Sequence, residues 1–580
     1  MRRPVWPIIA ACSIVRRRRC PSRRTHRAPE ASGERIVDPP LRPGPAGASS
    51  IGALVDNNRL LRAAFDTRIG DLRFWELAAA TRREVLTVAT EYTGSYRHAR
   101  RPDDVADWIS RPIIMGGHQP ELFHAGVWLK NASLDAYARA VGGTAVNLVV
   151  DIDRCVGATV AVPVGTPREA RLEHVPFDAG GPEVAWEERA VLDRDCFTTF
   201  GARAADLLAP LSPDAIVRRW WPLAVERAAE SHRLGLALAQ ARHLLEERFG
   251  LETLELPVSE LLRLPTVMVF TGWLLAHARA LHEAYNDALA AHRRQHRVRG
   301  RGRPMPDLAV RRDASGEWLE VPWWLWSRDD PRRRRVFASV ATPGALALSD
   351  LETLRIELPI APDTSPSKWV DALSRLEEHQ LRLRPRALVT TLIARVLVAD
   401  VFVHGVGGAA YDHLTDDIVR RLTGCDPPRH AVVSGTLRLP IDEVHPGFAS
   451  ADPGARLAAV QRELRDLEFH PEHHLGAVDG LPPTVHELVT EKRRWIDTFP
   501  TPALARRRCR EIRAANERMA FHLAGRRQDL LARVGPLAAA IRARKVLDSR
   551  DHPWCFFPET TLRRFLLLET RGDSSYPSAH

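Results

Sequence analysis

The sequence is poor in cysteine and has no long apolar run. Its seven cysteines are scattered over 580 residues, and no two of them form a Cys-x-x-Cys pair. This spacing argues against a zinc ribbon and a disulfide framework, and it favours a reducing, cytoplasmic compartment. No apolar run approaches the roughly 18 residues of a membrane-spanning helix, so we expect no membrane partner.

Several catalytic signatures are missing as well. The sequence contains no Gly-x-Ser-x-Gly elbow, no Gly-x4-Gly-Lys-Ser/Thr phosphate loop, no protein-kinase motif set and no His-Glu-x-x-His motif. Nothing therefore indicates a hydrolase, NTPase, kinase or zinc protease of these types. His470, His473 and His474 lie close together but lack a companion acid at a fixed spacing, so we interpret them as a loop and expect no metal there.

Positive charge is concentrated at the N-terminus. Residues 1–50 contain 11 arginines and 3 acidic residues, so they carry +8 of the net charge of +11 and leave +3 for the remaining 530 residues. A nearly balanced body gives no electrostatic case for binding nucleic acid. We interpret residues 1–50 as a disordered, Arg-rich extension. A natural start further downstream and a basic tail that contacts anionic surfaces are the alternatives.

The rest of the chain mixes strand and helix patterns, which is typical of an α/β protein with a parallel sheet and added helices. We expect this α/β core, with helical insertions, over residues 51–450. Residues 451–550 are helical and charged and predict an antiparallel helical hairpin or coiled coil, through which the chain could form a homodimer. Residues 551–580 are expected to be a C-terminal return segment and tail, in which "HPWCFFPETTLRRFLLLE" (552–569) predicts a strand and a short helix.

A β-α-β unit is the clearest local prediction. "RPIIMGG" (111–117) is a buried-strand pattern, "GVWLKNASLDAYARAV" (126–141) has a helical apolar stripe, and "AVNLVVDID" (145–153) is typical of a central parallel strand. The carboxyl ends of parallel strands form the ligand-binding edge of such sheets. Reactive side chains at the ends of these two strands are therefore candidates for binding a ligand.

Polar residues crowd the loop and helix after the first of these strands. They are Gly117, His118, Gln119, His124, Lys130 and Asn131. Glycine lets a ligand approach the backbone, the helix start supplies N–H groups, and Lys130 suits a phosphate or carboxylate. His118 is a candidate general base. The alternative is a turn whose histidines only satisfy backbone groups.

Two aspartates close the second strand. Asp151 and Asp153 are two residues apart and would face the same side of a strand. They are candidates for a catalytic base or for ligands of an amine or Mg²⁺. The alternative is a helix cap and a salt bridge with Arg154. Cys155, which follows, is interpreted as a buried thiol without a catalytic role.

A second strand-loop-helix junction follows "VADVFVHG" (398–405). Its loop and helix carry Gly405, Gly407, Tyr411 and Asp412, which could bind a ligand. The alternative is that Tyr411 packs and Asp412 caps the helix. Upstream, Arg384 and Arg386 suit a carboxylate or phosphate at the same edge, although such a pair is more often a solvated face. Residues 316–340 predict a β-hairpin around an Asp-Asp-Pro turn.

Two blocks of the sequence, residues 115–153 and residues 384–414, resemble the cysteine ligase (cysteine-adding enzyme) family of bacillithiol biosynthesis. "MGGHQPELFHAGVWLKN" followed by "LVVDID" is similar to the family's glutamine-rich loop and acidic strand end, and "RPRALVTTLIARVLVADVFVHGVGGAAYDHL" is similar to its Gly-rich block. The resemblance implies a Rossmann-like core related to HIGH-type nucleotidyltransferases, with a coiled coil. It implies a bacterial ligase that joins a cysteine-like carboxylate to the amine of an amino sugar, with ATP and Mg²⁺ as candidate cofactors.

The sequence departs from the family pattern at three points. His118 stands in place of a glutamine, the histidine of the acidic cluster is absent, and Gly408 stands where the family has a glutamate. A nucleotidyltransferase is the second interpretation, in which "HAGV" (124–127) is a worn His-x-Gly-His motif. The third is a dimerising scaffold with a vestigial pocket.

Overall fold

The computed structural model describes residues 34–38, 51–99, 105–298, 305–314, 316–339, 344–448, 452–478, 480–499 and 501–567. Its main sheet has the strand order β1–β16–β15–β4–β5–β8. These strands are β1 (Glu34–Asp38), β4 (Ile113–His118), β5 (Thr144–Val149), β8 (Leu254–Pro257), β15 (Val401–His404) and β16 (His430–Thr436). Five are parallel, and β1 pairs antiparallel with β16. Residues 34–38 are thus an edge strand, which corrects their assignment to a disordered extension; the rest of 1–50 lies outside the described residues.

The order of the parallel strands places a switch point in the sheet. Counted along the chain, it is 3-2-1-4-5, as in a Rossmann fold. The chain lays down β4, β5 and β8 toward one side and then adds β15 and β16 on the other. The direction changes between β4 and β15, where Val403 pairs with Gly116. The predicted α/β architecture with a parallel sheet is confirmed to this extent.

Both faces of this sheet are buried, which explains the continuous apolar runs of its strands. Along β4, Ile113 and Met115 join one hydrophobic core, and Ile114 joins the core on the opposite face. Helix α2 (Phe74–Gly94) contributes to the first core and helix α4 (Ala125–Ala140) to the second. The β-α-β unit predicted from the sequence is present as β4, α4 and β5.

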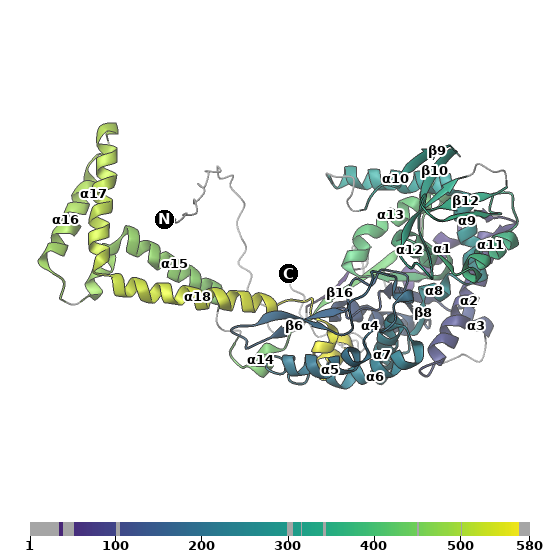
Figure 1. Cartoon of the computed structure of the whole chain (residues 1–580), viewed down its shortest axis with the longest axis horizontal. Helices are drawn as coiled ribbons and strands as arrows, with labels where there is room; N and C mark the ends of the chain where they lie inside the picture. The colour runs from purple at the N-terminus through teal and green to yellow at the C-terminus, as the bar shows by residue number, and fades with distance from the viewer. Residues whose placement is uncertain are drawn as a thin grey trace, which may run out of the picture. The chain divides into compact units, whose positions relative to one another are not determined.

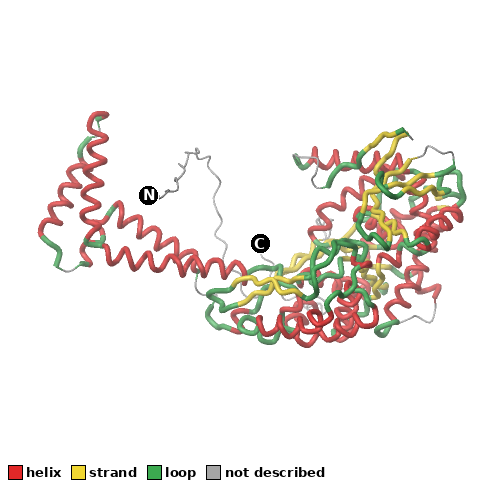
Figure 2. The backbone as a smooth tube through the Cα atoms, in the orientation of Figure 1, coloured by secondary structure: helices red, strands yellow, loops and turns green. Residues whose placement is uncertain are grey.

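A second, antiparallel sheet follows in the chain, with the order β13–β12–β11–β10–β14 and β9 beside β10 (Figure 2). Its strands are β9 (Val310–Asp313), β10 (Gly316–Ser327), β11 (Arg334–Ser339), β12 (Leu346–Ser349), β13 (Arg355–Leu358) and β14 (Leu381–Pro385). The hairpin predicted for 316–340 is confirmed as β10 and β11. Two small sheets pair β2 (Arg68–Ile69) with β3 (Leu72–Arg73) and β6 (Thr159–Val164) with β7 (Arg171–Pro176).

Helices fill the connections between the strands. They are α1 (Ile51–Ala63), α3 (Val105–Ser110), α5 (Arg194–Leu208), α6 (Val217–Ser231), α7 (Leu234–Arg248), α8 (Val258–Leu261), α9 (Pro265–Ala276), α10 (Ala278–Gln295), α11 (Pro366–Glu378), α12 (Ala387–Ile393), α13 (Val406–Thr423) and α14 (Ile441–Val444). Short turns of helix, η1 (Trp186–Glu188) and η2 (Ala394–Val398), stand among them. Within the described residues, no helix combines the length and the apolarity that crossing a bilayer requires.

Four helices occupy residues 453–547. They are α15 (Pro453–Phe469), α16 (Pro483–Asp497), α17 (Pro502–Phe521) and α18 (Ala524–Leu547), with η3 (Pro471–His473) and η4 (Leu475–Ala477) between the first two. α15 packs against α18, and α16 packs against α17 (Figure 1). An ion pair of 2.6 Å joins Arg526, at the start of α18, to Glu463, in the second half of α15, so these two helices are antiparallel. The four helices share a hydrophobic core of their own.

The C-terminal segment returns to the main body as η5 (Trp554–Phe556) and α19 (Glu559–Leu567). Trp554 is buried in the core beneath α4, and its backbone N–H donates a hydrogen bond to the Phe123 carbonyl. The expected short helix is present. The expected strand is not: within residues 551–567 the backbone makes only isolated bridges, such as Pro553 with His124, because two prolines remove N–H donors from the segment.

Candidate active site

The two segments singled out in the sequence meet at the switch point of the parallel sheet. β4 ends at His118 and the neighbouring strand β15 ends at His404. Gly117 and His118 therefore lie at the same edge as His404 and Gly405. In open α/β sheets, ligands bind in the crevice outside the strand ends at this point. The fold thus brings residues 116–131 and 404–412 together.

Lys130 connects the two sides of the switch point. Its Nζ donates a hydrogen bond of 2.9 Å to the Gly117 carbonyl. A Cβ placed on Gly405 would lie 3.9 Å from the Lys130 Cδ, so the lysine stem runs past the start of α13. The side chain is buried, and this burial, with the nearby charge of Arg242, lowers the pKa of Lys130 to about 8. A desolvated ammonium group attracts an anion more strongly than a hydrated one.

The N-terminus of α13 adds backbone donors to the site. Gly405 is the N-cap residue, and no side chain caps this helix end. Val406, Gly407 and Gly408, in the first turn, are exposed. The first N–H groups of a helix have no partner inside it and carry a partial positive charge. Together with Lys130, they make the switch point suited to a phosphate or carboxylate. Tyr411, one turn further, is also exposed.

His404 and Asp412 form a buried pair that the sequence analysis missed. The His404 Nε2 lies 2.9 Å from an Asp412 oxygen, and Arg395 lies 2.5 Å from the same oxygen. Burial alone would raise the pKa of Asp412, but the charge of Arg395 and the hydrogen bond from His404 hold it well below its usual value. Asp412 stays ionised and orients the imidazole, as the carboxylate partners of general-base histidines do. It neither caps the helix nor faces a ligand.

A signal for His404 was present in the sequence. The apolar run "VFVH" ends in His404, just as the strand pattern "IIMGG" is followed directly by His118. What the sequence does not reveal is the partner, because Asp412 reaches back from the second turn of α13. A histidine at a strand end is a stronger candidate for a general base when a carboxylate lies in the first two turns of the helix that follows.

Both ring nitrogens of His118 already have partners in the protein, unlike those of a general base that is free to react. Its Nδ1 lies 2.9 Å from the Gln119 carbonyl and its Nε2 3.2 Å from the Asn131 Oδ1. The ring packs edge-on against Phe123 and is almost fully buried. Burial, with the charges of Arg242 and Lys130, keeps the pKa of His118 well below its ordinary value. Both nitrogens face protein acceptors, so His118 orients the loop in this state.

Asn131 links this loop to a buried polar network beneath α4. Its Nδ2 donates to Glu246 at 2.8 Å, and Arg242 forms ion pairs with both Glu246 and Glu255. Asn147 of β5 donates to Glu255 at 2.7 Å. The two acids and Asn131 are fully buried. Such charges persist in an interior only when they are paired, so Asn131 has a structural role here and does not face a ligand.

Gln119 and Asp153 connect the strand ends to the antiparallel sheet. Gln119 donates to Asp153 at 2.9 Å, and Arg333, just before β11, donates to the other Asp153 oxygen at 2.9 Å. The Arg154 N–H also donates to Asp153. Burial raises the pKa of Asp153, but these hydrogen bonds more than compensate, so the net shift is downward. Asp153 therefore remains a carboxylate whose oxygens are both engaged.

Asp151 does not share a strand face with Asp153, because β5 ends at Val149 and both aspartates lie in the following turn. Asp151 is fully buried and accepts hydrogen bonds from the backbone and side chain of Ser259. Burial, with the nearby charge of Glu187, raises the pKa of Asp151 to about 7. The residue joins the end of β5 to the start of α8. The expected shared strand face is therefore wrong, whereas the catalytic role of Asp151 stays a prediction.

The two arginines predicted to bind an anion are already paired. Arg384, on β14, makes a two-pronged contact of 2.9 and 3.0 Å with Glu187 and a further ion pair with Glu377. Arg386 contacts Glu320 at 2.7 Å and stacks on Trp324. The alternating pattern of "LRLRP" reflects a strand of the antiparallel sheet, which the sequence analysis did not assign. In this structure protein carboxylates occupy both guanidinium groups, and the binding of a ligand by these arginines stays a prediction.

His124 caps α4 rather than pointing to a ligand. Its Nδ1 accepts a hydrogen bond of 3.1 Å from the Gly126 N–H. A Cβ on Gly126 would lie 2.1 Å from the Gly435 carbonyl of β16, so close packing between α4 and the sheet already requires glycine there. Helix packing and capping thus explain two residues of "HAGV" without a phosphate.

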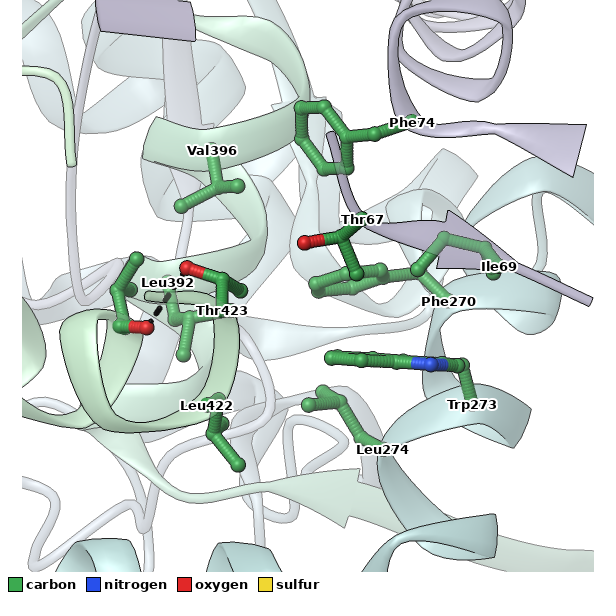
Figure 3. A pocket seen from close by; sticks show the side chains of 11 residues that line it. Thr67, Ile69, Phe74, Phe270, Trp273, Leu274, Leu392, Val396, Leu422 and Thr423 are labelled. Atoms are coloured by element: carbon green, nitrogen blue, oxygen red, sulfur yellow. Dashed lines mark hydrogen bonds between the residues drawn. The ribbon is translucent and has the colours of Figure 1, made fainter. Parts of the chain in front are cut away.

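Two hollows lie away from the residues of the switch point, and the larger one is an open hollow of about 550 Å³ on α17, lined by residues that include Arg506, Cys509 and Arg513. Figure 3 shows an apolar pocket lined by Phe74, Phe270, Trp273 and neighbours, with a free volume of about 10 Å³, which is the space of one water molecule. The Cys155 thiol is buried, and burial raises its pKa. Of the clustered histidines, His474 is paired with Asp466 at 2.8 Å, so this segment is a folded turn.

Comparison with known proteins gives no independent assignment. No protein-family model matches the chain, and no curated protein matches it significantly.

Proposed function

We propose that the chain is an enzyme that binds an anionic group of a small molecule at the switch point and forms a carbon–nitrogen bond there. The convergence of Lys130 and the uncapped start of α13 on Gly405 carries this proposal. The resemblance to the cysteine ligases of bacillithiol biosynthesis, with their HIGH-related core, supports a cysteine-like carboxylate and an amino-sugar amine as substrates.

The residues at the switch point fit the demands of amide formation. An amine that attacks a carboxyl carbon must lose a proton, and the carboxyl oxygen gains negative charge. His404, oriented by Asp412, is placed to accept that proton. Lys130 and the N–H groups of α13 are placed to stabilise the negative charge. His118 and Gln119 hold the backbone of the loop on which Gly117 and Lys130 meet.

The candidate cofactors fit to different degrees. ATP would supply the phosphoryl or adenylyl group that activates the carboxylate, and its phosphates match Lys130 and the start of α13. Mg²⁺ does not fit the predicted ligands. The oxygens of Asp151 are satisfied by Ser259, and those of Asp153 by Gln119 and Arg333.

Binding tests the location of the site. Isothermal titration calorimetry with ATP and with inorganic phosphate should show binding that Lys130→Met weakens on the order of 10- to 100-fold, because a hydrogen bond to a charged group is worth about 1.5–3 kcal/mol. Lys368→Met, an exposed lysine on α11, is the control and should bind as the wild type does. Equal affinities for all three proteins would remove Lys130 from the site.

Turnover tests the chemistry. Incubation with ATP, cysteine and glucosamine derivatives should release phosphate or pyrophosphate and form an amide detectable by mass spectrometry. His404→Gln should lower kcat roughly 10²- to 10⁴-fold, the usual contribution of a general base, while phosphate still binds. Binding without turnover for any amine would instead favour the non-catalytic scaffold.

A further inference from the structure

Three histidines converge away from the strand ends, where α10 packs against α13. His292 and His296 stand at the C-terminal end of α10, four residues apart, and His413 comes from the neighbouring α13. One nitrogen from each ring lies within 4.8 Å of the other two. Histidines at i and i+4 share a helix face, which is the arrangement that helical zinc sites use.

The contact between two of the rings is unusual for protein alone. His292 Nδ1 lies 2.5 Å from His413 Nε2, and the ring centroids of His292 and His296 are 4.4 Å apart. Two neutral imidazoles can share one proton at such a contact, but the third nitrogen then faces the pair without a proton to share. Two imidazole nitrogens on one tetrahedral Zn²⁺ stand about 3.3 Å apart, so a cation would accept these lone pairs once the rings of His292 and His413 separate by just under about 1 Å.

The end of the helix and a neighbouring ion pair make the surroundings suitable for a bound cation. His296 is the C-cap of α10, where the helix end carries a partial negative charge. The nearby charge of Arg293 is paired with Asp307 at 2.5 Å.

We propose that His292, His296 and His413 bind Zn²⁺ through their ring nitrogens. Imidazole is a preferred ligand of Zn²⁺, and three histidines leave a fourth, tetrahedral position for water. The ion would tie the end of α10 to α13, the helix whose N-terminus builds the switch point. The site shares no residue with the proposed ligase chemistry and stands independently of it.

Two other clusters among the described residues do not suit a cation as well. In His404, Asp412 and His430, the carboxylate is already paired with the buried Arg395. In the group of His470, Glu472 and His473, the glutamate is held by Lys492 at 2.6 Å. A positive side chain on the only carboxylate of a cluster opposes metal binding. Among the residues that the structure describes, no positive side chain is hydrogen-bonded to the ring nitrogens of the cluster between α10 and α13.

Metal titration of the full-length, untagged chain tests the proposal. After treatment with EDTA and dialysis, the protein is titrated with Zn²⁺ in competition with a chromophoric chelator. We expect one tight equivalent. His296→Ala and His413→Ala should each weaken binding on the order of 100-fold, at the upper end of what changes around a metal site cost. His174→Ala, an exposed histidine on β7, is the control and should leave the affinity unchanged.

Spectroscopy and a second variant decide between sites. Co²⁺ in place of Zn²⁺ should give the intense visible absorption of a tetrahedral site, and His296→Ala should abolish it. Far-ultraviolet circular dichroism identical to that of the wild type shows that the variant is folded, which its exposed position favours. The proposal is overturned if no tight equivalent binds, or if His473→Ala, rather than His296→Ala, removes the metal.

Discussion

The imidazole of His404 rests against Gly408 on the first turn of α13. A Cβ added to residue 408 would lie 2.9 Å from the His404 Nδ1, which is closer than such atoms approach in proteins. The absence of a side chain on residue 408 therefore leaves the space that the His404 ring occupies.

Gly408→Ala should destabilise the protein relative to Gly407→Ala. Both residues lie in the first turn of α13, so the gain in helix propensity is the same, but a Cβ on residue 407 meets nothing within 4 Å. Overpacking against His404 should cost about 1–3 kcal/mol. Urea unfolding of the two variants measures the difference, and equal unfolding free energies would show that the ring moves aside freely.

Anion binding should weaken as the pH rises through about 8. The pKa of Lys130 is lowered to about 8, so the side chain is a cation below this pH and neutral above it. Sulfate is a suitable probe, since it does not titrate in this range. Its dissociation constant in the wild type should increase between pH 7 and pH 9.5, whereas that of Lys130→Met should stay flat. A parallel pH response in both proteins would assign the effect to another group.

Asp151→Asn should remove a pH dependence of stability without removing activity. The pKa of Asp151 is raised to about 7, so between about 4 and 7 the folded state holds a proton that the unfolded chain has lost. The unfolding free energy of the wild type, relative to the variant, should therefore fall by about 4 kcal/mol as the pH rises through this window. Urea unfolding at pH 4.5 and pH 8 checks the sign. Loss of turnover in a stable variant would restore the catalytic interpretation.

Arg384→Met should destabilise the fold by about 3–5 kcal/mol, because it leaves the buried carboxylate of Glu187 without its partner, whereas Glu377 keeps Arg382. The double variant with Glu187→Gln should recover part of this loss. Arg332→Met is the control: its pair with Asp330 is exposed and screened by solvent, so its loss should leave the stability nearly unchanged. Thermal unfolding ranks the three proteins. If Arg384→Met keeps its stability but loses phosphate binding, the residue belongs to the site after all.

The sequence predicts the parts of this fold that depend on local pattern. β4, β5 and β15 are recognisable because strands buried on both faces must be apolar at every position. α4 has an amphipathic stripe, and the β10–β11 hairpin has aromatic strands around a charged turn. Each of these patterns spans only about twenty residues, so it can be recognised without knowledge of distant contacts.

The parts that depend on distant partners are not predictable in this way. Nothing in "LRLRP" states that Arg384 meets Glu187, almost two hundred residues away, or that its strand joins β10. Asp151 and His118 carry reactive groups, yet Ser259 and Asn131 decide that these groups are occupied. A polar side chain at a strand end thus indicates a site, while its role follows from neighbours that only the tertiary structure supplies.

The chain of contacts from Gln119 through Asp153 to Arg333 makes two distant events energetically interdependent. A ligand that draws Gln119 toward the switch point would release one oxygen of Asp153 and weaken its hold on Arg333. The coupling is reciprocal. A change in the antiparallel sheet that weakens the Asp153–Arg333 contact would alter ligand affinity by the same factor as the ligand alters that contact. Amide exchange rates in β10 and β11 would then report on occupancy at the ends of β4 and β15, which makes the second sheet a sensor of the first.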